Sequence, residues 1–212
     1  MDERAASDLL RVTKNWIPGL VGRAGEVAQV REAVARLVSG KGGLLVLEAT
    51  YGMGRSALAA EAMEQASRYG ITTTVGRSTA TDQRAFEGYR APYQALLDED
   101  VTGPTVLEIA FGERTIEDRT LEKWTVFAAF KSLLVEAGPH LLVLDDIDRA
   151  DRGTIEMTEY LVRNLIGEAG FPLLIVATQE PNPGDNGLRE AFDNVSTGVT
   201  PEYIRLGPLS VG

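Results

Sequence analysis

Residues 44–56 read LLVLEATYGMGRS, and this stretch decides the fold. Residues 44–47 are apolar without interruption, as in a strand that is buried on both faces of a parallel sheet. Gly52 and Gly54 follow, and residues 57–67 are rich in Ala, Leu, Met and Glu, which favour a helix. The stretch therefore predicts a buried strand, a glycine-containing loop and a helix in direct succession.

The same alternation continues along the chain. Further strands are predicted at residues 71–75, 141–144, 173–177 and 203–206, the last as an edge strand. Further helices are predicted at residues 27–38, 121–137, 154–166 and 187–192. Glycines and prolines cut residues 78–118 into short pieces with no clear pattern. The alternation predicts an α/β fold of three layers, a mainly parallel sheet flanked by helices, in one domain over residues 20–212 after a lead-in at 1–19.

The composition excludes several kinds of site. The 212 residues include no cysteine, which excludes disulfides, thiolate metal sites and cysteine nucleophiles, and His140 is the only histidine. The net charge of -10 argues against a general binder of nucleic acid. No apolar run approaches the roughly 20 residues that cross a bilayer, and the acidic N-terminus lacks the apolar segment of a secretory signal. We therefore expect a cytoplasmic protein without a membrane partner.

The loop after the first strand is close to the phosphate-binding pattern G-x-x-x-x-G-K-[ST]. Gly54 and Ser56 match it, whereas Ala49 stands in place of the first glycine and Arg55 in place of the lysine. Glycines let backbone N–H groups approach a phosphate, and the start of the next helix attracts anions. The residues predicted to bind phosphate are Thr50, Tyr51, Gly52, Met53, Gly54, Arg55, Ser56 and Ala57, with the Ser56 hydroxyl as a ligand of Mg²⁺. The alternative is a strand–turn–helix junction that merely uses glycines.

A second signal is the sequence LLVLDD at residues 141–146, four apolar residues followed by two acids. This is typical of a Walker B strand, in which Asp145 would hold Mg²⁺ and Asp146 would orient or activate the attacking water. The alternative is that the two acids cap the next helix or are simply solvated. Thr178, after the strand at 173–177, is a candidate sensor of the terminal phosphate. Ligands of parallel sheets bind at the carboxyl ends of the strands, where all these residues stand.

Together these motifs resemble the P-loop ATPase module of the STAND class, the signal-transduction NTPases with numerous domains. The nearest pattern is the AAA-like domain of large LuxR-type transcriptional regulators and of multidomain bacterial adenylate cyclases and kinases. Residues 20–27 (LVGRAGEV) resemble the family's VGRExEL, which implies that Gly22 and Arg23 lie near the adenine. Residues 145–151 (DDIDRAD) resemble DDLHWAD, residues 177–181 (ATQEP) resemble ATxRP, and residues 206–210 (LGPLS) resemble the L-x-PLS that leads into a helical lid. The resemblance implies a domain that lacks this lid, either excised from a longer protein or a stand-alone remnant.

Four departures from the family pattern bear on activity. They are Ala49 for glycine, Arg55 for lysine, Asp148 and Arg149 for His-Trp, and Glu180 for an arginine. The guanidinium of Arg55 is larger and planar where the family has a compact ammonium. Glu180 adds negative charge where an arginine would offset it. We expect that the fold and nucleotide binding are kept while hydrolysis is slow or lost; the alternative for Arg55 is drift in a chain that has few lysines.

The resemblance implies an ATP-binding switch domain of a signalling or transcription-regulating protein, with ATP and Mg²⁺ as ligands. Its partners would be other domains or proteins of a signalling assembly, including further copies of itself, and not nucleic acid. One alternative is a pseudo-NTPase scaffold that binds no nucleotide. Another is an AAA-type DNA-handling ATPase, against which the net charge of -10 counts.

Some other residues have a simpler structural interpretation. His140 is predicted to be a surface or strand-edge residue rather than a ligand. Trp124, Phe127 and Phe130 follow helical spacing and are predicted to lie in the core. Arg149 and Arg152 are assigned to a solvated face, with contacts to a neighbouring subunit as the alternative. Arg23 is either a nucleotide contact or an exposed loop residue.

Overall fold

The computed structural model describes residues 22–79, 85–98, 105–111, 123–181 and 198–208. Several predictions therefore fall outside the described residues: the lead-in at 1–19, the helix at 187–192, and the ends of two motifs at Leu20, Val21, Leu209 and Ser210.

Five strands form one sheet in which every described pair of neighbours is parallel. The strands are β1 (Gly43–Glu48), β2 (Thr72–Arg77), β3 (His140–Asp145), β4 (Leu173–Gln179) and β5 (Glu202–Arg205). Their order across the sheet is β2-β3-β4-β1-β5. The predicted strands are thus confirmed within one or two residues at each end, and the last one lies at an edge.

The central strands are apolar because both of their faces are covered. Successive side chains of a strand point to opposite faces. On β1, Leu44 and Val46 join one hydrophobic cluster, whereas Leu45 and Leu47 join another. All residues of β3 and β4 are buried in the same way. The unbroken apolar runs in the sequence therefore mark two cores, one on each side of the sheet.

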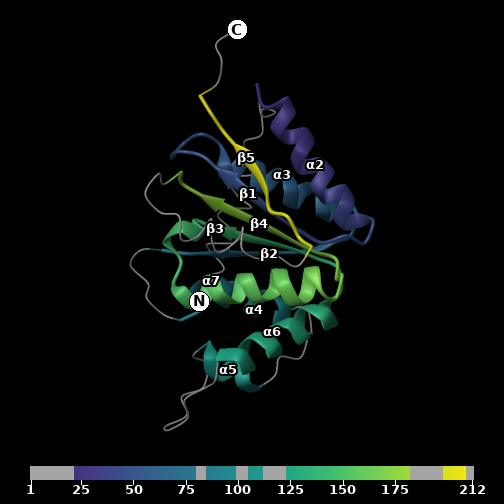
Figure 1. Ribbon diagram of the computed structural model, residues 1–212, viewed down its shortest axis with the longest axis vertical. Helices are drawn as coiled ribbons and strands as arrows, with labels where there is room; N and C mark the ends of the chain where they lie inside the picture. The colour runs from purple at the N-terminus through teal and green to yellow at the C-terminus, as the bar shows by residue number, and fades with distance from the viewer. Residues whose placement is uncertain (1–21, 80–84, 99–104, 112–122, 182–197, 209–212) are drawn as a thin grey trace.

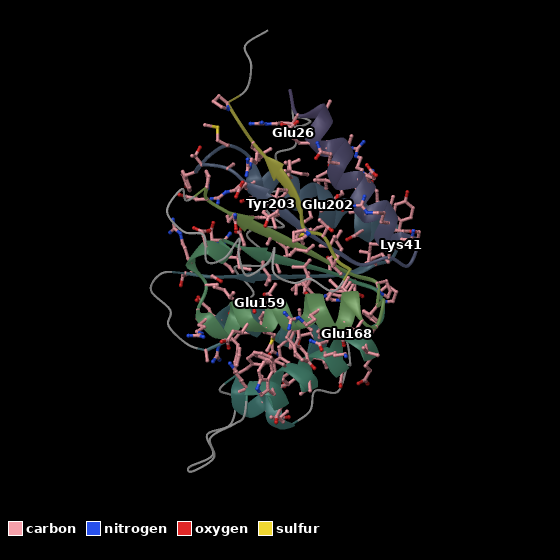
Figure 2. All side chains as sticks on the ribbon, in the orientation of Figure 1. Glu26, Lys41, Glu159, Glu168, Glu202 and Tyr203 are labelled. Carbon is pink, nitrogen blue, oxygen red and sulfur yellow. The ribbon has the colours of Figure 1, made fainter. Side chains whose placement is uncertain are left out.

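Helices complete the other two layers. Two of them, α2 (Ala24–Val38) and α3 (Arg55–Arg68), cover one face of the sheet, and three, α4 (Glu87–Asp98), α6 (Lys123–Ala137) and α7 (Arg152–Leu161), cover the other (Figure 1). The short helix α5 (Thr105–Ala110) packs beside α6, a 3₁₀ turn spans Ile147–Arg149, and α7 continues as a π-helical segment at Val162–Gly167. Side chains fill the space between the sheet and both helical layers (Figure 2). The three-layer α/β prediction is confirmed, and no helix follows β5 within the described residues.

Residues 78–118, which have no clear pattern in the sequence, contain α4 and α5. Helix α4 forms despite Gly88 and Pro92 because tertiary packing outweighs local propensity. Its buried Tyr89, Tyr93 and Leu96 lie in the core. The close approach of β2 and α4 requires a glycine at position 76, since a Cβ built at Gly76 would meet the Gly88 carbonyl oxygen at 1.7 Å.

Two predictions about single residues are wrong. Trp124 is 58% exposed, whereas Phe127 and Phe130 are fully buried as predicted. Trp124 lies in the first turn of α6, where its ring rests against the rings of Phe127 and Tyr160 and leaves one side to solvent. His140 is fully buried, because β3 lies between β2 and β4 and its first residue is already inside the sheet.

None of the described helices is long and apolar enough to cross a membrane.

Candidate functional site

The parallel arrangement brings the carboxyl ends of all five strands to one edge of the sheet. The last residues of the strands are Glu48, Arg77, Asp145, Gln179 and Arg205. Four of these five residues carry a charge, and two of them, Glu48 and Asp145, end strands that are largely apolar. Two neighbouring strand ends of opposite charge can pair directly, and this edge is where ligands of open parallel sheets bind.

The loop between β1 and α3 has the backbone geometry of an anion-binding loop. Gly52 and Gly54 have φ values of +81° and +98°, in the left-handed region that favours glycine. Gly54 directly precedes α3, so the free N–H groups of the first helical turn open onto the loop. Tyr51 is 87% exposed. Ala49 is buried and its N–H donates to the Gln179 carbonyl at 3.2 Å, so this position extends the sheet and its methyl group fits the core.

Arg55 is buried at the first position of α3 and faces two acids. Its Nη2 atom lies 3.4 Å from Asp146 Oδ1 and 3.6 Å from Glu180 Oε1. Arg149 also lies near Glu180, at 3.7 Å. The other terminal nitrogen of Arg55, Nη1, is buried and has no hydrogen-bond partner in the described part of the chain. Buried donors are normally paired, so this N–H group is a candidate contact for a ligand.

Asp145 is held on both of its carboxylate oxygens. Oδ1 accepts a hydrogen bond of 2.6 Å from the Thr178 hydroxyl, and Oδ2 accepts two from Arg77, at 2.9 Å and 3.1 Å. The Thr178 hydroxyl also accepts from the Asp146 backbone N–H at 2.9 Å. Thr178 therefore fixes both predicted Walker B acids in place.

Asp146 has an unusual backbone conformation. Its φ of +55° and ψ of +48° lie in the left-handed region, which is costly for residues other than glycine and recurs at functional sites. Burial raises the pKa of the Asp146 carboxyl, and the neighbouring charge of Asp145 raises it further, while Arg55 opposes both. Neither acid caps a helix with its side chain: the 3₁₀ turn at Ile147–Arg149 follows Asp146 without a side-chain cap hydrogen bond, and α7 is capped by Asp151, whose carboxylate accepts from the Thr154 N–H at 3.1 Å.

Arg23 is buried and not an exposed loop residue. Its guanidinium donates to Glu26 at 3.0 Å and to the carbonyl of Gly207 at 2.5 Å, with a longer contact of 3.4 Å to the Met53 carbonyl. Gly22 beside it has a φ of +80°. Arg23 thus ties the start of α2 to the loop after β1 and to the segment after β5.

The structure brings part of the predicted site together. Arg55, Asp146 and Glu180 form one ionic group, and Asp145 and Thr178 adjoin it through the Asp146 backbone. Ser56 and Ala57 are exposed on the first turn of α3. Within the described residues, no hydrogen bond joins Ser56 to Asp145, so their joint role as metal ligands stays a prediction.

Sequence reasoning missed the residues that pair at the strand ends. Arg77 is the partner of Asp145. Glu48, which is 8% exposed, accepts from Gln179 Nε2 at 2.8 Å and from Arg205 Nε at 2.7 Å. The sequence did contain a sign of the role of Glu48, because this residue directly follows an apolar run just as Asp145 does.

The family assignment follows from comparison with known proteins. The family model described as the AAA ATPase domain matches residues 19–176. The chain belongs to the AAA ATPase domain family. The matched residues include the loop at 49–54 and both aspartates of the predicted Walker B strand. The AAA-like resemblance in the sequence is thus confirmed at this level, while the narrower STAND and LuxR-type context stays a prediction.

Solved structures share the fold of this AAA ATPase domain. Cdc6p from Pyrobaculum aerophilum matches with a TM-score of 0.60 and 15% identity over 92% of this chain and 48% of that chain. The ORC1 protein of Aeropyrum pernix, solved in complex with DNA, matches with a TM-score of 0.54 and 18% identity over 91% of this chain and 46% of that chain. At such identities the likeness shows the fold alone, and the domain spans less than half the length of these two proteins. A search of the curated proteins finds no match.

AAA ATPases typically bind ATP with Mg²⁺, and the oxygen donors present suit this ion. Mg²⁺ prefers carboxylate and hydroxyl oxygens and keeps several of its waters. Among the described residues there is no cluster of three or more His, Cys, Asp or Glu side chains that could hold a metal. On Asp145, the hydrogen bond from Thr178 engages Oδ1 and the two hydrogen bonds from Arg77 engage Oδ2, so a metal ion would share this carboxylate with them. The residues therefore fit an ion held by Ser56, Asp145, waters and the phosphates of a nucleotide.

Proposed function

We propose that this AAA ATPase domain binds ATP with Mg²⁺ and acts as a switch in a larger signalling or transcription-regulating protein, with slow or lost hydrolysis. The observation that carries the proposal is the environment of Arg55. This arginine is buried beside the left-handed Gly54, and its Nη1 has no hydrogen-bond partner among the described residues. A buried cationic N–H without an acceptor favours an anion in that place, since leaving it unpaired costs about 1–3 kcal/mol.

The other predicted residues take roles around this arginine. Backbone N–H groups of residues 50–57 bind the phosphates, and Ser56 and Asp145 hold Mg²⁺, which supplies positive charge against the phosphates when it is bound. Thr178 holds Asp145 and Asp146 in register, so it acts on the terminal phosphate through them. Arg23 and Gly22 shape the wall near the adenine, because the hydrogen bonds of Arg23 already join three segments there.

Slow hydrolysis follows from the charges near Asp146. Arg55 divides its charge between Asp146 and Glu180, so less of it is available to the terminal phosphate. Glu180 adds a negative charge beside the group that should orient the attacking water. Both effects raise the energy of a transition state whose charge lies on phosphate oxygens.

Equilibrium binding tests the proposal. ATP, ADP and GTP are titrated with Mg²⁺ against the wild type, Arg55→Ala and a control, Arg31→Ala. Arg31 also pairs with a carboxylate, that of Glu61, but lies on α2 away from the strand ends. Loss of a charge-assisted hydrogen bond should weaken ATP binding in Arg55→Ala by about tenfold or more and leave Arg31→Ala unchanged. Equal affinities in the two variants would contradict the assigned phosphate site.

Turnover tests the second half of the proposal. Arg55→Lys restores the compact ammonium of the family pattern, so its rate of ATP hydrolysis should exceed that of the wild type. The rate is measured at saturating ATP, so that changes in affinity do not enter. No gain in rate would show that Arg55 is not what limits hydrolysis.

The second candidate is a scaffold that binds no nucleotide. It is supported by the charge balance of the site: Asp145, Asp146 and Glu180 each have an arginine partner without any ligand. Absence of binding at millimolar ATP would favour this scaffold. Under the switch proposal, ATP instead changes the association of the protein with its partners or with further copies of itself, which size-exclusion chromatography with and without ATP measures.

Direct DNA handling has less support. The ORC1 relative was solved with DNA, but the likeness to it concerns the fold alone. This chain has a net charge of -10, and acidic side chains such as Glu26, Glu159 and Glu202 lie on α2, α7 and β5 (Figure 2). Such a surface repels phosphates unless salt is high.

A further inference from the structure

Arg77 is the last residue of β2, and the register of the sheet places it directly beside Asp145 of β3. Both Nε and Nη2 of its guanidinium donate to the same carboxylate oxygen, Oδ2, at 3.1 Å and 2.9 Å. The Asp145 side chain is 7% exposed, whereas that of Arg77 is 45% exposed. A buried carboxylate therefore has a cationic partner that reaches it from the solvent side.

The end of β2 is held firmly enough to keep Arg77 in this position. Gly76 lies against the backbone of Gly88 in α4, and the next residue, Ser78, is buried and donates its N–H to the Asp145 carbonyl at 3.0 Å. The pair is thus fixed by backbone contacts on both sides of Arg77. A pair of flexible surface side chains has no such support and would contribute little to stability.

A buried carboxylate needs a counter-charge, because an unpaired charge in the interior is costly. In a nucleotide site of this type that charge comes from the divalent cation. We infer that Arg77 is the resident counter-cation of Asp145, so that a divalent cation must compete with it for this carboxylate. Arg77 is then a positioning residue that sets how strongly nucleotide binding depends on Mg²⁺.

The two oxygens of Asp145 have different roles in this scheme. Thr178 holds Oδ1 and keeps the carboxylate oriented while the partner of Oδ2 changes. Release of Arg77 therefore frees Oδ2 without loss of the hydrogen bond to Thr178. The part of the inference that concerns nucleotide rests on the proposed function, whereas the competition for Asp145 does not.

The direct test measures Mn²⁺ binding to the nucleotide-free chain by electron paramagnetic resonance. Arg77→Gln removes the charge and keeps a polar side chain of similar reach, so Mn²⁺ should bind about tenfold more tightly than to the wild type. The matched control is Arg205→Gln, because Arg205 also ends a strand of the same sheet and donates to a buried carboxylate, that of Glu48. The control should leave Mn²⁺ affinity unchanged, and Arg77→Gln combined with Asp145→Asn should abolish the gain.

Equal Mn²⁺ affinity in the wild type and Arg77→Gln would overturn the inference, as would an equal gain in Arg205→Gln. Circular dichroism establishes that each variant is folded. If Arg77→Gln does not fold, the wild type itself provides the test. Its ATP affinity should change by less than about threefold when EDTA replaces Mg²⁺, since Arg77 already neutralises Asp145. A loss of more than about tenfold, as expected when the metal is an indispensable counter-charge, would overturn the inference.

The two proposals fail in distinguishable ways. A chain that binds no ATP while Arg77→Gln gains Mn²⁺ affinity refutes the proposed function and supports the role of Arg77. A chain that binds ATP while Arg77→Gln leaves Mn²⁺ affinity unchanged supports the proposed function and refutes the role of Arg77.

Discussion

Arginine side chains set the electrostatics of single residues at the carboxyl edge of this sheet. Arg77 pairs with Asp145, Arg205 with Glu48, and Arg55 with Asp146 and Glu180. The carboxylates of Glu48 and Asp145 are nearly buried, so each of these pairs replaces contacts with water that the acids lost on folding. Removing one partner of such a pair leaves a buried charge behind, which explains why the tests of Arg77 and Arg205 use glutamine, a neutral residue that keeps a polar group.

A single residue, His140, also predicts how the stability of the fold depends on pH. His140 is buried, shares a hydrogen bond of 2.7 Å with the Thr74 hydroxyl, and has an Nδ1 atom without a partner among the described residues. Burial lowers the pKa of His140 to about 4, so the unfolded chain takes up a proton before the folded one does. His140 therefore contributes stability above the unfolded pKa of about 6.5, and this contribution is lost as the pH falls toward about 4, by about 2 kcal/mol at pH 5.

Urea unfolding at about pH 7.5 and about pH 5 measures this effect in the wild type and in His140→Gln. Glutamine can still bond to Thr74 but does not titrate, and the many carboxylates contribute equally to both proteins. The loss of unfolding free energy on acidification should be smaller in the variant by about 2 kcal/mol. The same loss in both proteins would show that His140 is not the group responsible.

At the scale of elements, close backbone packing and a shared cap join α4 to its neighbours. Asp151 accepts hydrogen bonds from the N–H groups of Phe86 and Glu87 at the start of α4 and from that of Thr154 in α7, so one carboxylate satisfies the first turns of two helices. Gly88 lies between Gly76 of β2 and Thr154 of α7. These contacts order a segment whose own sequence favours no single structure.

Gly76→Ala is expected to loosen this arrangement. The added methyl group would lie 1.7 Å from the Gly88 carbonyl oxygen, which is backbone and cannot rotate away, so α4 must shift. The cost should be about 2–3 kcal/mol of unfolding free energy, near the upper end for overpacked sites. Chemical denaturation of the variant measures it.

Gly43→Ala serves as the matched control on β1, because a Cβ there would approach nothing closer than 3.8 Å. This variant should lie within about 1 kcal/mol of the wild type. Equal destabilisation by the two variants would mean that the close approach of β2 and α4 is not what matters.

On the scale of the whole molecule, the strand order decides which residues can act together. β3 and β4 lie between β2 and β1, and β5 closes the other side. Strand-end residues as far apart in the sequence as Glu48 and Arg205 therefore meet along one edge of the sheet, and the loop after β1 lies beside them. A ligand held at this edge contacts elements from most of the domain, so its binding should stabilise the fold as a unit.

The corresponding prediction concerns ligand-linked stability. ATP with Mg²⁺ at about 100 times its dissociation constant should raise the free energy of unfolding by about 2.7 kcal/mol, as for any ligand that binds the folded state alone. Arg55→Ala at the same ATP concentration should show a much smaller increase. Stabilisation that is equal in the two proteins would place the nucleotide away from Arg55.

Much of the fold was predictable from the sequence because the cues are local. The apolar runs at residues 44–47, 141–144 and 173–177 mark strands that are buried on both faces, and Gly52 and Gly54 mark a turn that needs left-handed backbone. The order of the two motifs also indicated the AAA-like fold. Helix α4 was not predictable, because Gly88 and Pro92 oppose a helix locally and only burial of Tyr89 and Tyr93 outweighs them.

The sequence by itself determined the parallel α/β architecture, the loop geometry and the candidate acids, since each depends on the hydrophobic pattern and residue types of one short segment. Only the tertiary structure decided which arginine meets which carboxylate, that Arg23 and His140 are buried, and that Trp124 is exposed. These facts depend on strand order and register, which join residues such as Arg77 and Asp145 that lie far apart in the chain. No local pattern encodes such pairings, because the energy that fixes them comes from packing the whole sheet.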